Sequence, residues 1–216
     1  MSSDGARGRG RRPGGPDTRG QILTAARKSF ADKGFGRTTI RAVAGDAEVD
    51  PALVHHYFGS KDDLFLAALD IPVDPRRLVP KVFDDGVQGA GERLLRLFLS
   101  VWDDPHTRLP LLALVRSSLV QETPETLLQQ GILRMILQPL RAALPSDEAD
   151  RRVQLVVSQM SGLVLTRYLL ALEPLASMPA EELVAWVAPT LQRYLDGPLQ
   201  EPGDTEGRPD PTRKHP

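Results

Sequence analysis

The sequence predicts an all-α protein in which an N-terminal three-helix helix-turn-helix domain precedes a larger helical domain. Apolar residues recur at helical spacing through the stretches that lack proline, and no stretch shows the strict alternation of a β-strand. The chain has 216 residues, 41% hydrophobic and 25% charged, which suffices for one small and one larger domain. We expect these domains over residues 17–64 and 65–197, between disordered ends at 1–16 and 198–216.

The composition excludes several kinds of protein. The chain has no cysteine, so it has no disulfide, catalytic thiolate or cysteine-ligated metal. No apolar stretch follows the N-terminal arginines, so we expect no secretory signal. The longest apolar run, residues 161–172, is interrupted by Arg167 and is shorter than the ~20 residues of a membrane-spanning helix. We expect a soluble, cytoplasmic protein without a membrane partner.

Charge is distributed unevenly along the chain. Residues 1–41 hold ten basic and three acidic residues, a net charge of +7, whereas the whole chain has a net charge of −1. The remainder therefore carries −8. A cationic N-terminal end on an anionic body is typical of a DNA-binding head attached to a body that does not bind DNA.

The N-terminal residues 1–16 are Gly, Arg and Pro with little to bury, which predicts a disordered basic arm. Two interpretations stay open for this arm: a solvated tail, or a segment whose arginines reach phosphates or a minor groove. An amphipathic helix should follow from Asp17, with Asp17 or Thr18 as its cap, to Lys33, where Gly34 favours a left-handed helix end.

The stretch from Thr38 to Lys61 predicts two short helices joined by a tight turn. The first runs over residues 39–46, and residues 47–49 form the turn. Asp50 should cap the second helix, whose first turn holds Pro51. Gly59 ends it, and Ser60 caps the helix after it. Two histidines and a tyrosine on so short a helix indicate a surface that meets an outside partner, which we take to be double-stranded DNA.

The body should contain helices over residues 92–102, 109–120, 124–144, 147–172 and 179–195, of which the fourth is the longest and is uninterrupted. Pro139 should kink or split the third. The helix over 147–172 is apolar nearly all round in its second half, which predicts burial on several sides. We expect the last two helices to form a homodimer interface with those of a second copy. A monomer with a central helix is the alternative.

The pattern TTIRAVAGDAEVDPALVHHYFGSKDDLF resembles the helix-turn-helix of TetR-type transcriptional repressors, and it follows a helix ending in FADKGF, as in that family. The specific match covers about residues 18–69. The segment SQMSGLVLTRYLLALEPLASMPAEELVAWVAPTLQRYL is similar to the C-terminal part of an actinobacterial subgroup. The resemblance implies a repressor that binds a palindromic operator as a homodimer and needs no cofactor.

The resemblance also implies which residues meet DNA. It assigns phosphate contacts to Thr38, Thr39 and Lys61, and a base-edge contact to Arg41, whose forked donors suit guanine. Pro51, Ala52 and Leu53 would make van der Waals contacts with bases. His55, His56 and Tyr57 match positions that contact phosphates and base edges. Each of these side chains has a simpler interpretation as a solvated surface residue.

One position departs from the family pattern. Glu48 occupies the turn position that usually holds glycine. A left-handed backbone there costs ~1 kcal/mol for a residue other than glycine, and a carboxylate near DNA is repelled by phosphates.

Regulators of this kind bind a small-molecule effector in the body, which releases DNA by favouring a different spacing of the two heads. A mainly aliphatic pocket would suit a hydrophobic or amphipathic ligand. All the candidate lining residues are also interpretable as plain core, and Arg167 is the candidate polar anchor; the set is Trp102, Leu111, Val115, Met135, Met160, Val164, Arg167 and Tyr168.

Two other functions compete with a ligand-released repressor. An enzyme is disfavoured because no phosphate loop, dinucleotide motif or nucleophile elbow is present, and because the adjacent His55 and His56 lack the i, i+4 spacing of a metal pair. An effector-independent, architectural DNA-binding protein would have the same head, so the sequence leaves it open.

Overall fold

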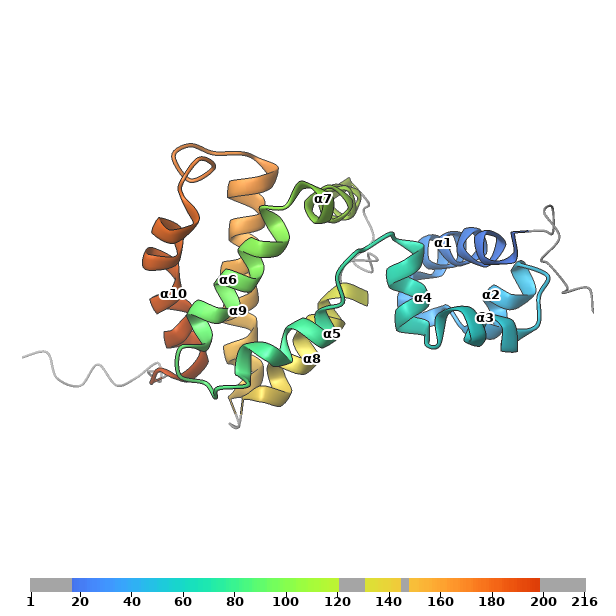
Figure 1. Ribbon diagram of the computed structural model, residues 1–216, viewed down its shortest axis with the longest axis horizontal. Helices are drawn as coiled ribbons and strands as arrows, with labels where there is room; N and C mark the ends of the chain where they lie inside the picture. Colours follow the sequence, from blue (N-terminus) through green and yellow to red (C-terminus); the bar gives the residue numbers. More distant parts are fainter. Residues whose placement is uncertain (1–16, 121–130, 145–147, 199–216) are drawn as a thin grey trace, which may run out of the picture. The chain divides into compact units, whose positions relative to one another are not determined.

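The computed structural model describes residues 17–120, 131–144 and 148–198. The described segments contain helices and no strand, which confirms the all-α prediction (Figure 1). The chain divides after Asp70 into two compact units, here called unit 1 and unit 2. The expected basic arm over 1–16 and the tail from residue 199 onward lie outside the described residues.

The described part of unit 1, from residue 17 onward, forms four helices: α1 (Thr18–Arg37), α2 (Ile40–Asp46), α3 (Pro51–Phe58) and α4 (Lys61–Ala68). Three aromatic rings form the centre of its core. Phe65 meets Phe30 and Phe35 edge-on, with ring centroids 4.9 and 5.1 Å away, and Phe30 and Phe35 stack at 5.9 Å. These contacts bind α4 to α1, so the first and last helices of unit 1 form a rigid support for α2 and α3.

The helix boundaries in unit 1 follow local capping chemistry. The Asp17 carboxylate accepts a hydrogen bond from the Gly20 N–H at 3.0 Å and caps α1. Gly34 interrupts α1 with φ 72°, a left-handed angle that glycine adopts without strain. The Ser60 hydroxyl caps α4 by accepting from the Asp63 N–H at 3.1 Å. The predictions for Asp17, Gly34 and Ser60 are confirmed.

Unit 2 contains α5 (Pro75–Leu78), η1 (Pro80–Phe83), α6 (Ala90–Trp102), α7 (Pro105–Val120), α8 (Leu133–Ala143), α9 (Ala149–Leu163), η3 (Val164–Leu169) and α10 (Ala180–Asp196). Helix α10 packs along α6 and α9 (Figure 1). Leu95, Val156, Leu183 and Leu191 are buried in the core between these helices. The α6–α10 contact is close at Gly91, where a Cβ atom would lie 2.5 Å from the Gln192 backbone nitrogen.

The helix predicted without interruption over 147–172 differs in the structure. The α-helix ends at Leu163 and continues as a π-helical turn, and the Leu170 N–H then donates to the Leu165 carbonyl. The Thr166 hydroxyl donates to the Gly162 carbonyl at 2.7 Å, a bond that competes with the regular backbone ladder. Ala171 follows with φ 49° and stops the helix. Periodicity alone does not reveal such a change of winding.

Two further predictions are only partly covered. Of the helix expected over 124–144, the structure describes α8, which contains Pro139, while residues 121–130 lie outside the described part. The expected caps Ser146 and Asp147 of the next helix also lie outside it.

Candidate nucleic-acid interface

Helix α3 presents one exposed face because its other face forms part of the unit 1 core. The Asp50 carboxylate accepts from the Ala52 N–H at 2.7 Å, and Pro51 stands in the first turn, where its missing N–H leaves no bond unmade. Val54 and Phe58 are buried. Outward from that buried face the helix exposes Ala52, Leu53, His55, His56 and Tyr57, all of them predicted DNA contacts.

Apolar surface on this face is unusual for a solvated helix. Leu53 is 40% exposed and Tyr57 38% exposed, although Val54 between them is fully buried. The ring of His56 meets that of Tyr57 edge-on at 5.5 Å. Exposed apolar groups ringed by polar ones mark a contact surface, and Leu53 has the chemistry to meet a thymine methyl group.

The hydrogen bonding of His55 determines what its outer nitrogen offers to DNA. Nδ1 of His55 lies 2.9 Å from the carbonyl oxygen of Gly59, and that oxygen only accepts, so Nδ1 carries the proton. In the neutral ring Nε2 is then an acceptor. It suits an exocyclic amino group on a base better than a phosphate oxygen.

Two of the predicted residues, Thr39 and Arg41, lie at the start of α2. The Thr39 hydroxyl caps the helix by accepting a hydrogen bond from the Ala42 N–H at 3.1 Å, and Thr39 is exposed. Arg41, two residues later, is also exposed. The DNA contacts expected of these two residues stay predictions.

The expected phosphate contact of the Thr38 side chain is wrong. Thr38 is 1% exposed, and its hydroxyl donates to the carbonyls of Ser29 at 3.0 Å and Gly34 at 2.8 Å. The side chain therefore holds α1 against the start of α2. Its neighbour Thr39 is the residue with a hydroxyl on the surface.

Lys61 is half-buried and held in place on both sides of its ammonium group. Nζ lies 4.4 Å from the Phe35 ring centroid and donates to the Gly36 carbonyl at 3.3 Å. These two contacts fix the position of the ammonium charge.

The turn between α2 and α3 has a left-handed residue at Glu48. Glu48 has φ 54°, and its N–H donates to the Gly45 carbonyl at 3.1 Å. The Val49 N–H donates to the Ala44 carbonyl at 2.9 Å. A glutamate therefore adopts a left-handed backbone conformation in the turn that sets the direction of α3.

In unit 2, the structure brings some of the expected effector-lining residues together. The rings of Trp102 and Tyr168 lie 5.4 Å apart, and both contact Phe98, which the sequence analysis did not select. Phe98 and Trp102 are aromatic residues four positions apart on one helix, and this spacing could have identified Phe98 from the sequence. Val115, Met160 and Val164 are half-buried, whereas Leu111 and Met135 are buried.

The side chain of Arg167 mainly stabilises the fold. It is 9% exposed, and Nη1 donates to the carbonyls of Leu175 at 2.6 Å and Met178 at 2.9 Å, which fastens the loop before α10. The Nε of Arg167 is buried without a hydrogen-bond partner. Burial raises the pKa of Tyr168 well above its usual range, and a 2.8 Å hydrogen bond to Asp103 adds to this shift, so Tyr168 stays a neutral donor.

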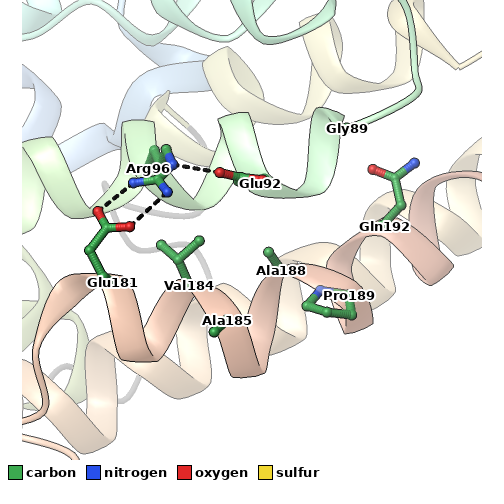
Figure 2. A pocket seen from close by; sticks show the side chains of 9 residues that line it. All are labelled: Gly89, Glu92, Arg96, Glu181, Val184, Ala185, Ala188, Pro189 and Gln192. Carbon is green, nitrogen blue, oxygen red and sulfur yellow. Dashed lines mark hydrogen bonds and ion pairs between the residues drawn. The ribbon is translucent and has the colours of Figure 1, made fainter.

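An open groove of about 430 Å³ lies between α6 and α10 and contains none of the predicted effector residues (Figure 2). Arg96 spans its wall, hydrogen-bonded to Glu92 at 2.8 Å and to both carboxylate oxygens of Glu181 at 2.6 and 2.8 Å. These groups satisfy one another, which leaves the groove with an apolar floor. The lining residues are Gly89, Glu92, Arg96, Glu181, Val184, Ala185, Ala188, Pro189 and Gln192.

Two searches of the described residues gave no site. They contain no cluster of three or more His, Asp or Glu side chains suited to a metal ion. None of the helices in the described part is long and apolar enough to cross a membrane.

Comparisons with known proteins match both units. Residues 22–68 match the family model for bacterial regulatory proteins of the tetR family, and residues 88–195 match the model for the tetracyclin repressor-like C-terminal domain. A TetR-family regulator of known structure from Streptomyces coelicolor A3 is 36% identical, with a TM-score of 0.51 over 86% of this chain and 98% of that one.

Two curated relatives are also similar. The transcriptional regulator BetI of Rhizobium meliloti (strain 1021) is 30% identical over 167 residues, which are 71% of this chain and 79% of that protein. The regulator HbdR of Aromatoleum sp. (strain CIB) is 33% identical over 87 residues, which are 40% of this chain and 36% of HbdR.

Proposed function

The chain belongs to the TetR family of DNA-binding transcriptional regulators, which are not enzymes, and we propose that it is a repressor that binds a palindromic operator as a homodimer and is released by a small hydrophobic or amphipathic ligand. The exposed face of α3 is the observation that carries the DNA-docking part of this proposal. Its cap and buried anchors fix the helix, and its outward side chains offer apolar and ring-nitrogen contacts at the same time.

Operator contact divides among three kinds of side chain in this proposal. Arg41 reads a base edge, and His55, His56 and the apolar residues of α3 fill the major groove. Thr39 and Lys61 contact phosphates, which positions the head without reading sequence. Few base-edge donors are present, so the spacing of the two heads and the shape of the DNA should contribute to specificity.

The last two helices of unit 2 supply the surface that we propose for the second copy. Trp186 on α10 is 72% exposed, and Leu165 after α9 is 42% exposed. Between Leu155 and Leu165, α9 exposes small side chains at Ser158 and Gly162, which would allow a partner helix to approach closely. Single exposed leucines are ordinary, but a tryptophan as exposed as Trp186 favours an interface.

Release by a ligand requires that the ligand prefer one spacing of the heads over the other. The half-buried cluster of Phe98, Trp102 and Tyr168 supports an aromatic or aliphatic effector, because these rings offer apolar surface beside one hydroxyl. Arg167 supports an effector anchor less well than expected, since its Nη1 is bound to the loop before α10. A ligand screen by thermal shift tests this part, and no stabilisation by any compound would favour an effector-independent regulator.

Operator binding is tested by mobility shift on the DNA that flanks the gene for this protein. Arg41→Ala should reduce discrimination between operator and random DNA by about 1–3 kcal/mol. Lys61→Ala should weaken binding to both DNAs equally and lower the salt dependence. Lys81→Ala, an exposed cation of unit 2, is the matched control and should behave as the parent. Parent-like binding by both head variants would refute the docking.

The interface is tested separately by sedimentation. Trp186→Glu should give monomers at concentrations where the parent is a dimer, because a carboxylate would be buried without a partner. Leu109→Glu, at a residue 64% exposed on α7, is the control and should leave the dimer intact. A dimeric Trp186→Glu protein would exclude this surface.

A further inference from the structure

We propose that Arg19, which neither the helix-turn-helix motif nor its resemblance assigned, is a DNA-phosphate contact that the ring of Phe58 holds beside the recognition helix. The inference rests on the proposed docking of α3 and adds a contact from outside the two helices of the motif. The proposed phosphate contact would raise the affinity for DNA and position the protein on the duplex, but it would not read the base sequence.

The ring of Phe58 fixes where the Arg19 guanidinium lies. Arg19 is exposed in the first turn of α1, and its Cζ lies 5.3 Å from the Phe58 ring centroid. Phe58 is the last residue of α3 and is 8% exposed, so the ring cannot turn away. A guanidinium on an aromatic face keeps its edge donors free to bind in the plane of the group.

Arg19 also differs from Arg27 and Arg37 of unit 1 in what it binds. Arg27 donates to the Ala68 carbonyl at 2.6 Å, and Arg37 donates to the Lys33 carbonyl at 3.0 Å. In the described part of the chain, Arg19 has no carboxylate within ion-pair distance. The nearby Asp17 carboxylate accepts from the Gly20 N–H at the start of α1. The donors of Arg19 are therefore available to an acceptor outside the chain.

The position of Phe58 places this charge next to the proposed DNA surface. The rings of Tyr57 and Phe58 have centroids 6.3 Å apart, and Tyr57 is on the exposed face of α3. Arg19 thus lies against the C-terminal residue of α3, the residue that follows Tyr57. Phosphates border the groove, so a cation at this place meets the backbone and not a base edge.

A purely structural role is the competing explanation. A cation near the C-terminus of α3 interacts favourably with the helix dipole, and Arg19 could stabilise unit 1 in this way alone. That role would change the melting temperature but would not change the number of counterions that DNA releases on binding. The salt dependence of binding therefore separates the two explanations.

The experiment measures DNA affinity of the full chain by fluorescence anisotropy over a range of salt, on the flanking DNA and on a random-sequence duplex. Arg19→Gln should weaken binding several-fold on both duplexes alike and reduce the slope of log affinity against log salt by about 0.9 per protomer. Arg19→Lys should keep the slope. Phe58→Leu should weaken binding while retaining the charge. Lys28→Gln, an exposed cation further along α1, should bind as the parent does.

An unchanged slope in Arg19→Gln, with or without a lower melting temperature, would overturn the proposal, as would a loss confined to the flanking DNA. If Arg41→Ala and Lys61→Ala behave as expected while Arg19→Gln binds like the parent, the docking of α3 stands and the Arg19 contact alone is wrong. If none of the three variants changes binding, the docking itself is wrong, and the Arg19 contact is wrong with it.

Discussion

Glu48 allows a test of backbone strain and of charge at one position. Its φ of 54° is left-handed, and its side chain is exposed, so substitution removes no core packing. A left-handed backbone costs roughly 1–2 kcal/mol for an ordinary residue, whereas asparagine adopts it readily. Glu48→Asn should therefore raise the free energy of unfolding by about 1 kcal/mol.

Glycine and glutamine at position 48 separate the effect of backbone strain from the effect of the side-chain charge. Glu48→Gly also relieves the strain, but glycine loses ~0.5–1 kcal/mol more in conformational entropy, so its net gain should be smaller. Glu48→Gln keeps the strain and removes only the charge, and it should melt with the parent. In DNA binding, all three variants lose a carboxylate near phosphates and should bind more tightly at low salt, with a smaller gain at high salt.

Thermal unfolding of the full chain measures the strain. A gain of about 1 kcal/mol corresponds to a rise in melting temperature of about 2–8 °C, the larger value if unit 1 unfolds on its own. An Asn variant that melts at or below the parent temperature would refute the strain at Glu48. A Gln variant as stable as the Asn variant would show that charge, not backbone conformation, limits stability here.

Three further substitutions test contacts that the structure reveals. Thr38→Val should lower the free energy of unfolding by about 1–3 kcal/mol in chemical denaturation, because it removes the buried hydroxyl that donates to the Ser29 and Gly34 carbonyls. Gly91→Ala should destabilise unit 2 by about 1–3 kcal/mol in a thermal melt, since its Cβ would meet the α10 backbone, whereas Gly45→Ala, with nothing within 4 Å, should not destabilise the protein. Arg152→Met should lower the melting temperature and speed amide exchange at the end of α10, because the guanidinium donates to carbonyls there; unchanged exchange would argue against this capping role.

Much of the DNA-binding head could be predicted because its signals are local. Asp17, Asp50 and Ser60 cap helices through N–H groups two or three residues away, whereas Gly34 interrupts α1 and Gly59 ends α3 through their own backbone angles. Such interactions depend on neighbours in sequence, so the pattern of residues contains them. Glu48 is also a local signal, because the sequence shows a glutamate at the turn position that usually holds glycine.

The effector region was less predictable because it depends on which side chains the packing uses. An arginine among apolar residues indicates a ligand anchor as readily as a structural tie, and only the positions of the Leu175 and Met178 carbonyls decided the role of Arg167. Phe98 was missed although Trp102 and Tyr168 were found, since helical spacing does not tell which apolar residues face one another across helices.

The sequence by itself determined the all-α class and the helix-turn-helix with its caps and stops, because each follows from the conformational preferences of a few adjacent residues. Only the tertiary structure decided that the Thr38 hydroxyl is buried against Ser29 and that Arg19 rests on Phe58. These contacts join residues on different helices, or residues brought together by a bend. A donor or a charge is available to DNA only if packing has not already given it a partner.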